Sequence, residues 1–309
     1  MKGISFTGGF FIMLGLALFG LVLSGMISGV VLLAGTSPDG ETMKEAMRDP
    51  SNAGTMRALQ ALSVFLSMFV PAVITAYIVS RKPFRLLGFR NDATWKQAGL
   101  VLLVVIISVF IAGALTWLNR QVPLSPDLKE KFEQLEMTYL EQVELMVDFS
   151  SVGGYLMSIV ILALLPAIFE EVLFRGGLQN FLARATKRPW VAILVVSVLF
   201  SLVHFSFFGF LPRVFLGIML GMIYYATGNL WLAILAHFIN NLMAITQAYI
   251  ISQQGRSIRE VMMEEMPTSY WGFLALPLLY LLYVALRRTA TRTQEEPLHD
   301  FPQKEEHAV

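Results

Sequence analysis

The chain has 309 residues, of which 56% are hydrophobic and 15% are charged, and its mean hydropathy is +0.63. These values exclude an ordinary soluble domain, which is about 45–50% apolar and about 25% charged. A net charge of +1 gives no electrostatic basis for binding nucleic acid, and the lack of cysteine excludes disulfides, thiolate metal sites and a cysteine nucleophile. We therefore expect an integral membrane protein whose main surroundings are the lipid bilayer.

About eight segments are long and apolar enough to cross a bilayer, which takes about 20 residues in a helix. In chain order they lie near 8–34, 58–80, 97–118, 153–175, 190–206, 208–226, 229–250 and 269–287. The first segment is longer than the apolar part of a cleavable signal peptide, so we expect it to be retained. Three segments contain a proline, which bilayer helices tolerate when neighbours pair the freed carbonyls. The sequence predicts an all-α polytopic membrane protein, a bundle of about eight transmembrane helices.

The charged residues between these segments predict an orientation, because cytoplasmic loops carry an excess of Lys and Arg. With eight helices, three basic regions fall on one side of the membrane: 81–96, 176–189 and 287–292. The 119–150 connection, on the opposite side, has seven acidic residues against three basic ones. We expect both termini in the cytoplasm and the protein in the inner membrane of a bacterial cell.

The acidic connection also has a helical pattern. Its apolar residues between 127 and 148 recur at near-helical spacing. This predicts either an amphipathic helix on the outer membrane surface or a solvated loop helix without a role. Arg213, directly after Pro212, is predicted to lie at the same outer interface, and the Gly217-x-x-x-Gly221 motif predicts close helix packing.

Two adjacent carboxylates and an arginine, Glu170, Glu171 and Arg175, end an apolar run from Ile159 to Phe169. Ionisable groups inside a bilayer are costly and mark functional sites. On a helix, Glu171 and Arg175 are four residues apart and can pair, whereas Glu170 is rotated by about 100° and points elsewhere. We predict a Glu171–Arg175 pair and a free Glu170 that can act as a general base. The simpler alternative is an interfacial salt bridge that ends the helix.

Two later apolar segments also carry polar residues. His204 follows Phe200 by four residues and Asn241 follows His237 by four, so each pair shares a helix face. Taken singly, His204 is typical of an interface anchor, and Asn241 is typical of a hydrogen bond between helices.

Depth in the membrane connects these polar residues. At 1.5 Å per residue, Glu170, the histidines and Asn241 lie roughly 12–22 Å from the basic edge. The estimate holds for Glu170 if the helix continues through Gly176-Gly177. A common depth predicts one polar layer in the membrane interior.

The three motifs in this order resemble those of the CPBP family, which includes the type II CAAX prenyl proteases and the bacteriocin-processing or Abi-like immunity proteins. The motifs are Glu170-Glu171-x-x-x-Arg175, Phe200-x-x-x-His204 and His237-x-x-x-Asn241. The resemblance covers about residues 150–250. It implies an intramembrane endopeptidase that hydrolyses a peptide bond in a membrane-associated peptide or protein.

The resemblance also implies roles for the six residues. Glu170 and His204 would activate a water molecule, and His237 and Asn241 would stabilise the oxyanion. Arg175 would orient the carboxylates of Glu170 and Glu171.

The need for a metal stays open at this point. Glu170, His204 and His237 could hold Zn²⁺ with one open position, as in a metalloprotease. Asn241 is a poor zinc ligand and a natural amide donor, which favours a metal-independent mechanism. Two other functions are compatible with the sequence: a non-catalytic immunity or scaffold protein, and, with less support because no inverted repeat is visible, a transporter.

The chain divides into four parts on this interpretation. Residues 1–150 hold the N-terminal helices and the outer amphipathic loop, and 151–250 hold the core with the three motifs. Residues 251–288 form an outer loop and the last helix. The polar tail, 289–309, is predicted to be a disordered cytoplasmic segment.

Overall fold

The computed structural model describes residues 3–34, 46, 49–257 and 270–289; most of the predicted tail, 290–309, lies outside these residues. Within the described ranges, seven helices are long and apolar enough to cross a membrane: Phe6–Leu33, Ala53–Val79, Trp95–Arg120, Val152–Thr186, Phe210–Thr227, Leu230–Gln253 and Tyr270–Thr289. The remaining predicted segment forms a shorter apolar helix, Pro189–Leu202. The all-α polytopic bundle is confirmed, and the shorter helix accounts for the eighth predicted position.

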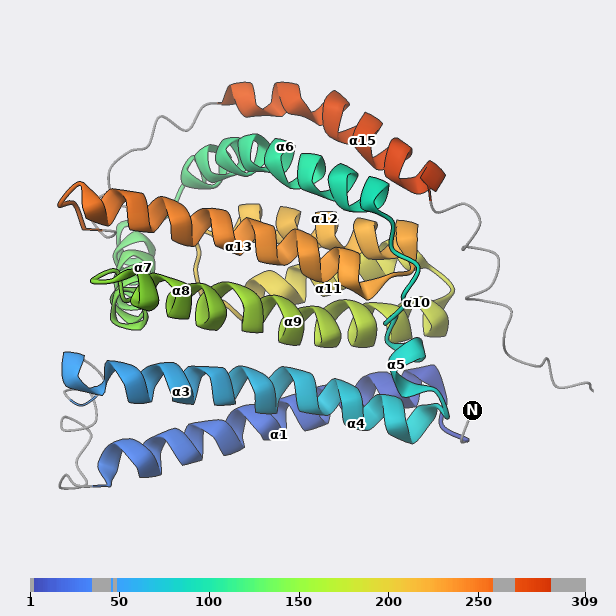
Figure 1. The fold of residues 1–309 in the computed structure, drawn as a ribbon, viewed down its shortest axis with the longest axis horizontal. Helices are drawn as coiled ribbons and strands as arrows, with labels where there is room; N and C mark the ends of the chain where they lie inside the picture. The colour runs from blue at the N-terminus through green and yellow to red at the C-terminus, as the bar shows by residue number, and fades with distance from the viewer. Residues whose placement is uncertain (1–2, 35–45, 47–48, 258–269, 290–309) are drawn as a thin grey trace, which may run out of the picture.

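The long helices run side by side along one axis of the molecule (Figure 1). One layer holds α1 (Phe6–Leu33), α3 (Ala53–Val64) and α4 (Val70–Val79), the last two joined by a π-helical turn, Phe65–Phe69. The central helices are α11 (Pro189–Leu202), α12 (Phe210–Thr227), α13 (Leu230–Gln253) and the helix that spans Val152–Thr186. On the far side lie α6 (Trp95–Arg120) and the last span, made of a 3₁₀ turn, Tyr270–Ala275, and α15 (Leu276–Thr289).

The ends of the bundle differ in charge. The N-terminus, the 80–94 connection with its short helix α5 (Pro83–Leu86), the 187–188 turn and the end of α15 lie together at one end (Figure 1). The predicted amphipathic helix forms as α7 (Pro126–Met146) at the other end. The described parts of the three basic regions therefore share one end of the bundle, which we call the basic end, and the acidic helix α7 lies at the opposite end.

Asn229 closes a tight turn at the basic end. Gly228, with φ of +63°, ends α12, and the Asn229 side chain caps α13 by accepting from the Trp231 N–H at 3.0 Å. Its amide nitrogen donates to Asp92 at 2.9 Å. Burial acts to raise the pKa of Asp92, but hydrogen bonds from Arg90 and Asn229 lower it overall. The carboxylate therefore ties the 80–94 connection to the start of α13.

The fourth span is continuous through its proline and its glycines. It consists of α8 (Val152–Ile159), a π-helical turn (Val160–Leu164), α9 (Leu165–Glu171), a π-helical segment η4 (Val172–Gln179) and α10 (Asn180–Thr186). The helix continues through Gly176-Gly177. The depth estimate for Glu170 rests on this condition. A Cβ on Gly176 would lie 2.7 Å from the Leu87 carbonyl oxygen, and one on Gly177 would meet the Met13 sulfur. Glycine therefore lets neighbouring segments approach this helix closely.

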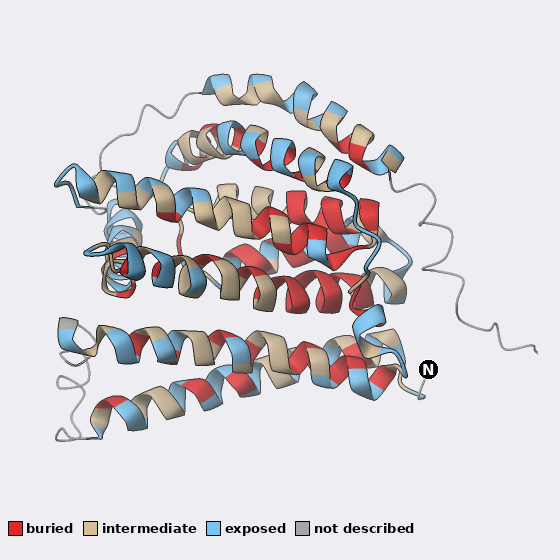
Figure 2. Cartoon of the chain, viewed as in Figure 1, coloured by how far each residue is buried: buried red, intermediate tan, exposed pale blue. Residues whose placement is uncertain are grey.

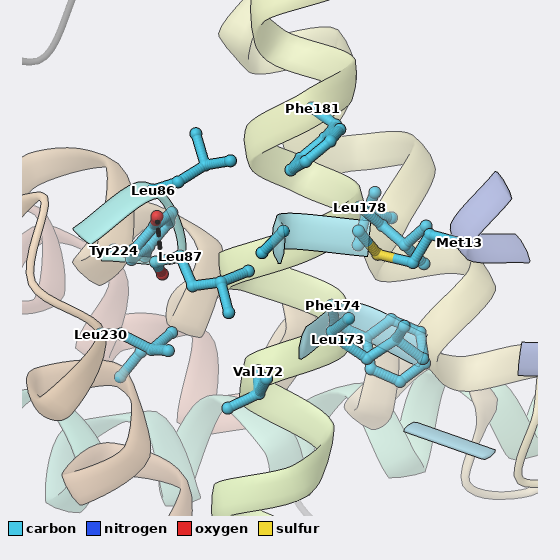
Figure 3. Close-up of a cluster of buried hydrophobic side chains, with 14 of the residues drawn as sticks. Met13, Leu86, Leu87, Val172, Leu173, Phe174, Leu178, Phe181, Tyr224 and Leu230 are labelled. Carbon is cyan, nitrogen blue, oxygen red and sulfur yellow. Dashed lines mark hydrogen bonds between the residues drawn. The ribbon is translucent and has the colours of Figure 1, made fainter. Parts of the chain in front are cut away.

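The best-packed core lies toward the basic end. Figure 3 shows this cluster, in which side chains of η4 pack against residues of α1, α5, α12 and α13. Residues 170–181 are all buried, whereas most residues of 152–169 are half-buried or exposed. Figure 2 shows the same contrast between the two ends. Glu170 therefore lies at the boundary between a densely packed half and a more open half.

The Gly217-x-x-x-Gly221 motif makes close contacts, as predicted. A Cβ on Gly217 would lie 2.8 Å from Ser197 Cβ and 2.9 Å from Ser197 Cα, on the facing helix α11. A Cβ on Gly221 would lie 2.7 Å from Oε1 of Gln179. The motif brings α12 against both α11 and η4.

We expect Gly217→Ala to destabilise the fold by about 1–3 kcal/mol, because the added methyl group overpacks a contact that includes backbone. Gly113→Ala is the matched control, since no atom lies within 4 Å of a Cβ at this helical position. The measurement is the free energy of unfolding in detergent micelles. Equal stability of the two variants would contradict the contact.

Candidate active site

Glu171 and Arg175 form a fully buried ion pair, as their spacing predicts. Arg175 Nη1 lies 2.5 Å from Glu171 Oε1, and the two side chains are 1% and 0% exposed. Arg175 Nη2 donates to the Gly217 carbonyl at 3.2 Å, and the guanidinium lies 4.7 Å from the centre of the Phe200 ring. Because the glycine motif brings α12 close, its backbone can help to hold this arginine.

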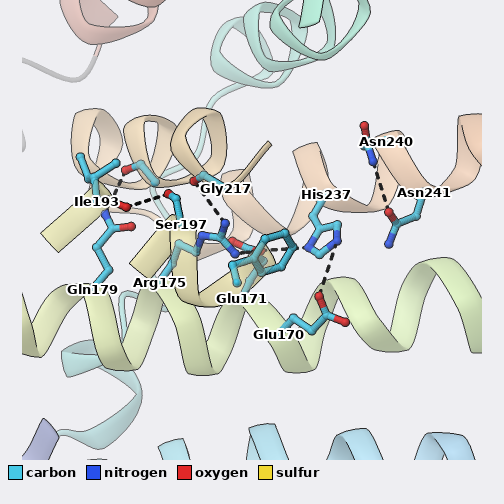
Figure 4. Close-up of polar contacts among 12 residues, drawn as sticks. Glu170, Glu171, Arg175, Gln179, Ile193, Ser197, Gly217, His237, Asn240 and Asn241 are labelled. Atoms are coloured by element: carbon cyan, nitrogen blue, oxygen red, sulfur yellow. Dashed lines mark hydrogen bonds and ion pairs between the residues drawn. The ribbon is translucent and has the colours of Figure 1, made fainter. Parts of the chain in front are cut away.

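His237 adds a third member to this pair (Figure 4). Its Nδ1 lies 2.9 Å from Glu171 Oε1. A carboxylate paired with an arginine only accepts hydrogen bonds, so Nδ1 of His237 is the donor and carries a hydrogen. This contact fixes the ring and turns Nε2 toward Glu170.

Glu170 faces the same histidine from the other side. Its Oε2 lies 3.9 Å from His237 Nε2, which is too long for a direct hydrogen bond. This oxygen is buried and has no hydrogen-bond partner in the described residues. Glu171 Oε2 is likewise buried without a partner, but Glu171 Oε1 pairs with Arg175 and His237. The two adjacent carboxylates therefore differ, one paired and one not, as helical geometry predicts.

His204 lies beside this cluster but not within a helix. Helix α11 ends at Leu202, so the expected helix over 190–206 is too long, and His204 lies in the turn that follows. Its Nδ1 lies 2.8 Å from the Phe200 carbonyl oxygen, which can only accept, so Nδ1 is the donor. Its side chain is close enough to Glu170 to interact with it electrostatically.

Phe200 is the apolar centre of the site. Its ring centre lies 5.1 Å from that of His204 and 5.8 Å from that of His237, both edge to face. With Arg175 over the same ring, Phe200 contacts a residue from each of the three motifs. This contact explains the Phe200-x-x-x-His204 spacing.

Asn241 lies one turn beyond His237 on α13. Its Oδ1 accepts from the Asn240 amide at 3.3 Å, and no partner of its own amide nitrogen is found among the described residues. The structure thus places Glu170, Glu171, Arg175 and His237 in one contact network, His204 against it through Phe200, and Asn241 next to His237 along the helix.

Sequence reasoning missed Gln179, which continues the i, i+4 row from Glu171 and Arg175. Its amide donates to the Gly221 carbonyl at 3.0 Å, one turn from the Arg175 contact with Gly217. The row of polar residues at four-residue spacing was the signal that could have revealed it.

The loop that carries His204 is held by residues that no local pattern indicates. Asn119 of α6 donates to the Phe207 carbonyl at 2.8 Å. The Ser206 hydroxyl donates to Glu136 of α7 at 2.7 Å, and the ring of Phe132 stacks on Phe207 at 4.4 Å. Helix α7 therefore packs on this loop.

The residues present do not form a metal site as they are arranged. In the described ranges, no three His, Asp or Glu side chains cluster closely enough to hold a metal ion. Glu170 Oε2 and His237 Nε2 lie 3.9 Å apart, and the rings of His204 and His237 both contact the Phe200 ring. We derive no step through a metal.

A buried free carboxylate, two histidines with defined hydrogen positions and an amide are the groups of a hydrolytic acid–base site inside a polytopic membrane protein. Residues 152–243 match the family model of the type II CAAX prenyl endopeptidase Rce1-like proteins. The matched segment is just under a third of the chain and contains all six predicted site residues. This match confirms, over residues 152–243, the resemblance seen in the three motifs.

One curated relative is the uncharacterized protein YpbD of Bacillus subtilis (strain 168), 36% identical over 85 residues. The match covers 26% of this chain and 40% of YpbD, so the chain aligns with less than half of the length of YpbD. No solved structure gives a significant match.

Proposed function

We propose that this protein is an intramembrane endopeptidase that hydrolyses a peptide bond in a membrane-associated peptide or protein. One observation carries the proposal: Glu170 presents a buried, unpaired carboxylate oxygen toward His237, within a cluster whose other charges are paired. The family of the 152–243 segment supports an endopeptidase at the same coarse level.

Glu170 and His204 are the groups that activate water in this proposal. Because Nδ1 of His204 donates to a carbonyl, Nε2 of the neutral ring carries a lone pair and can accept a hydrogen bond from water. Glu170 removes the proton, the hydroxide attacks the carbonyl carbon, and Glu170 then gives the proton to the leaving amine as the C–N bond breaks. The products are a carboxylate and an amine.

His237 and Asn241 stabilise the tetrahedral oxyanion. With Nδ1 of His237 donating to Glu171, the ring can donate from Nε2 only when it is an imidazolium. The Asn241 amide supplies a second donor one turn away.

The test is hydrolysis by the purified protein in proteoliposomes, with a membrane-anchored peptide library and mass spectrometry in H₂¹⁸O. The expected result is cleavage that places one ¹⁸O in the new carboxylate and is lost in His204→Ala. A protein that folds and cleaves nothing in the library would favour the non-catalytic immunity or scaffold function instead.

Metal removal distinguishes the two mechanisms left open by the sequence. Because Glu170, His204 and His237 do not form a ligand set, we expect activity to survive prolonged dialysis against a chelator and to be unchanged by added Zn²⁺. Elemental analysis of the active preparation measures bound zinc. Loss of activity on chelation, restored by one equivalent of Zn²⁺, would contradict the metal-independent mechanism.

We propose further that the basic end faces the cytoplasm and α7 faces outward, because Lys and Arg concentrate in cytoplasmic loops. The cysteine-free chain permits a direct test with single cysteines at two exposed positions, Gln134→Cys on α7 and Lys82→Cys at the basic end. In intact cells an impermeant maleimide should label the first variant and reach the second only after permeabilisation. The opposite labelling pattern would reverse the orientation.

A further inference from the structure

Arg213 is a cation beside the candidate active site that the proposed mechanism does not use. It lies in the first turn of α12, four residues before Gly217, and its side chain is half-buried. Its guanidinium lies 5.3 Å from the centre of the Tyr139 ring of α7.

The Arg213 guanidinium lacks a hydrogen-bond or ion-pair partner in the part of the chain that the structure describes. Its Nη1 is buried without a hydrogen bond, and the side chain forms no ion pair there. Glu136 is an acid on the neighbouring face of α7, but its carboxylate accepts from the Ser206 hydroxyl at 2.7 Å. A buried guanidinium N–H left unpaired costs free energy unless a ligand pairs with it.

The position of Arg213 connects it to the reacting groups. A Cβ on Gly209 would collide with Nη1 of Arg213, so the guanidinium lies against the loop that also carries His204. The side chains of Arg213 and His204 are close enough to interact electrostatically, and so are those of His204 and Glu170. Arg213 thus lies on the α7 side of the site, away from the densely packed half.

We propose that Arg213 binds a carboxylate of the peptide substrate, either its terminal α-carboxylate or an acidic side chain near the cleaved bond. A guanidinium matches a carboxylate with two parallel N–H···O hydrogen bonds, which a lysine cannot reproduce. The Tyr139 ring lies over the guanidinium, and the lack of a side chain at Gly209 lets Nη1 lie against the loop. The proposal rests on the endopeptidase function, because it assigns the end of the substrate that this site recognises.

The experiment measures binding in the Glu170→Gln background, where no turnover complicates it. The probes are dansylated apolar tetrapeptides in matched pairs: a free C-terminal acid against its amide, and an internal Glu against Gln with an amidated terminus. Binding to protein in nanodiscs is followed by fluorescence anisotropy. We expect one acidic member to bind about 10-fold or more tightly than its neutral partner, and that pair identifies the source of the carboxylate.

Arg213→Gln should abolish this preference, and Arg213→Lys should retain only part of it. The matched control is Arg120→Gln, which removes an exposed arginine from the same end of the bundle and should leave the preference unchanged. If Arg213→Gln does not fold, a preference unchanged in Arg213→Lys overturns the proposal. Equal binding of acid and neutral probes, no binding of either, or a preference that survives Arg213→Gln also overturns it.

The binding experiment and the hydrolysis test can fail independently of each other. An acid preference that depends on Arg213, in a protein that hydrolyses nothing, would leave the carboxylate site standing and remove the endopeptidase function. Hydrolysis that depends on Glu170, without any acid preference, would support the endopeptidase function and remove the carboxylate site.

Discussion

Glu170→Gln should lower peptide hydrolysis by about 10²–10⁴-fold, the range that a general base contributes. Glutamine keeps the shape of the side chain but cannot accept a proton from water. The free energy of unfolding should change little, because the Glu170 carboxylate makes no hydrogen bond in the described part of the chain. The measurements are kcat/KM on an identified substrate and unfolding in detergent.

Glu171→Gln is the matched control, because it changes the same chemical group one residue along. Glu171 accepts from both Arg175 and His237, so its loss should lower stability as well as activity. The contrast between the two variants is the signature of a free base beside a structural carboxylate. Full activity in Glu170→Gln would remove Glu170 from the reaction.

Arg175→Met should produce the largest loss of stability, about 3–5 kcal/mol, because it leaves the Glu171 carboxylate buried without its strongest partner. Part of this loss comes from the uncompensated charge rather than from the lost contact. The double variant Glu171→Gln/Arg175→Met should therefore be more stable than Arg175→Met alone. Equilibrium unfolding in mixed micelles measures the stability of both variants.

Arg120→Met provides the comparison, since Arg120 is exposed at the end of α6. A surface substitution of this kind usually stays within about 0.5 kcal/mol of the parent. If Arg175→Met were equally mild, or if the double variant were the least stable of the set, the buried pair would not have the energetic role that its geometry indicates.

Helical periodicity made much of the site predictable from the residues. Spacings of four place Glu171 with Arg175 and His237 with Asn241 on shared faces, and the structure keeps both spacings within helices. The same periodicity separates Glu170 from Glu171. Apolar length predicted the spans. The largest difference is at the fourth, which continues to Thr186 rather than ending near 175, and α11 (Pro189–Leu202) ends before His204.

Contacts between distant segments could not be predicted in this way. The contact of His237 with Glu171 joins residues 66 apart, and the Asn119 contact with Phe207 joins residues 88 apart. Nothing in the local sequence sets such distances, because they depend on how the helices pack. The same holds for Arg213, which the sequence placed at an interface and which packing places under α7.

The residues alone therefore fixed the class of protein, its spans and the chemical groups of the Glu170-Glu171-x-x-x-Arg175 motif, because apolar length and helical periodicity are local properties. Only the tertiary structure decided which nitrogen of each histidine carries its hydrogen, since that depends on Glu171 and the Phe200 carbonyl as partners. It also decided that Glu170 keeps a free oxygen at the edge of the packed core, because neighbouring helices determine which polar groups find partners.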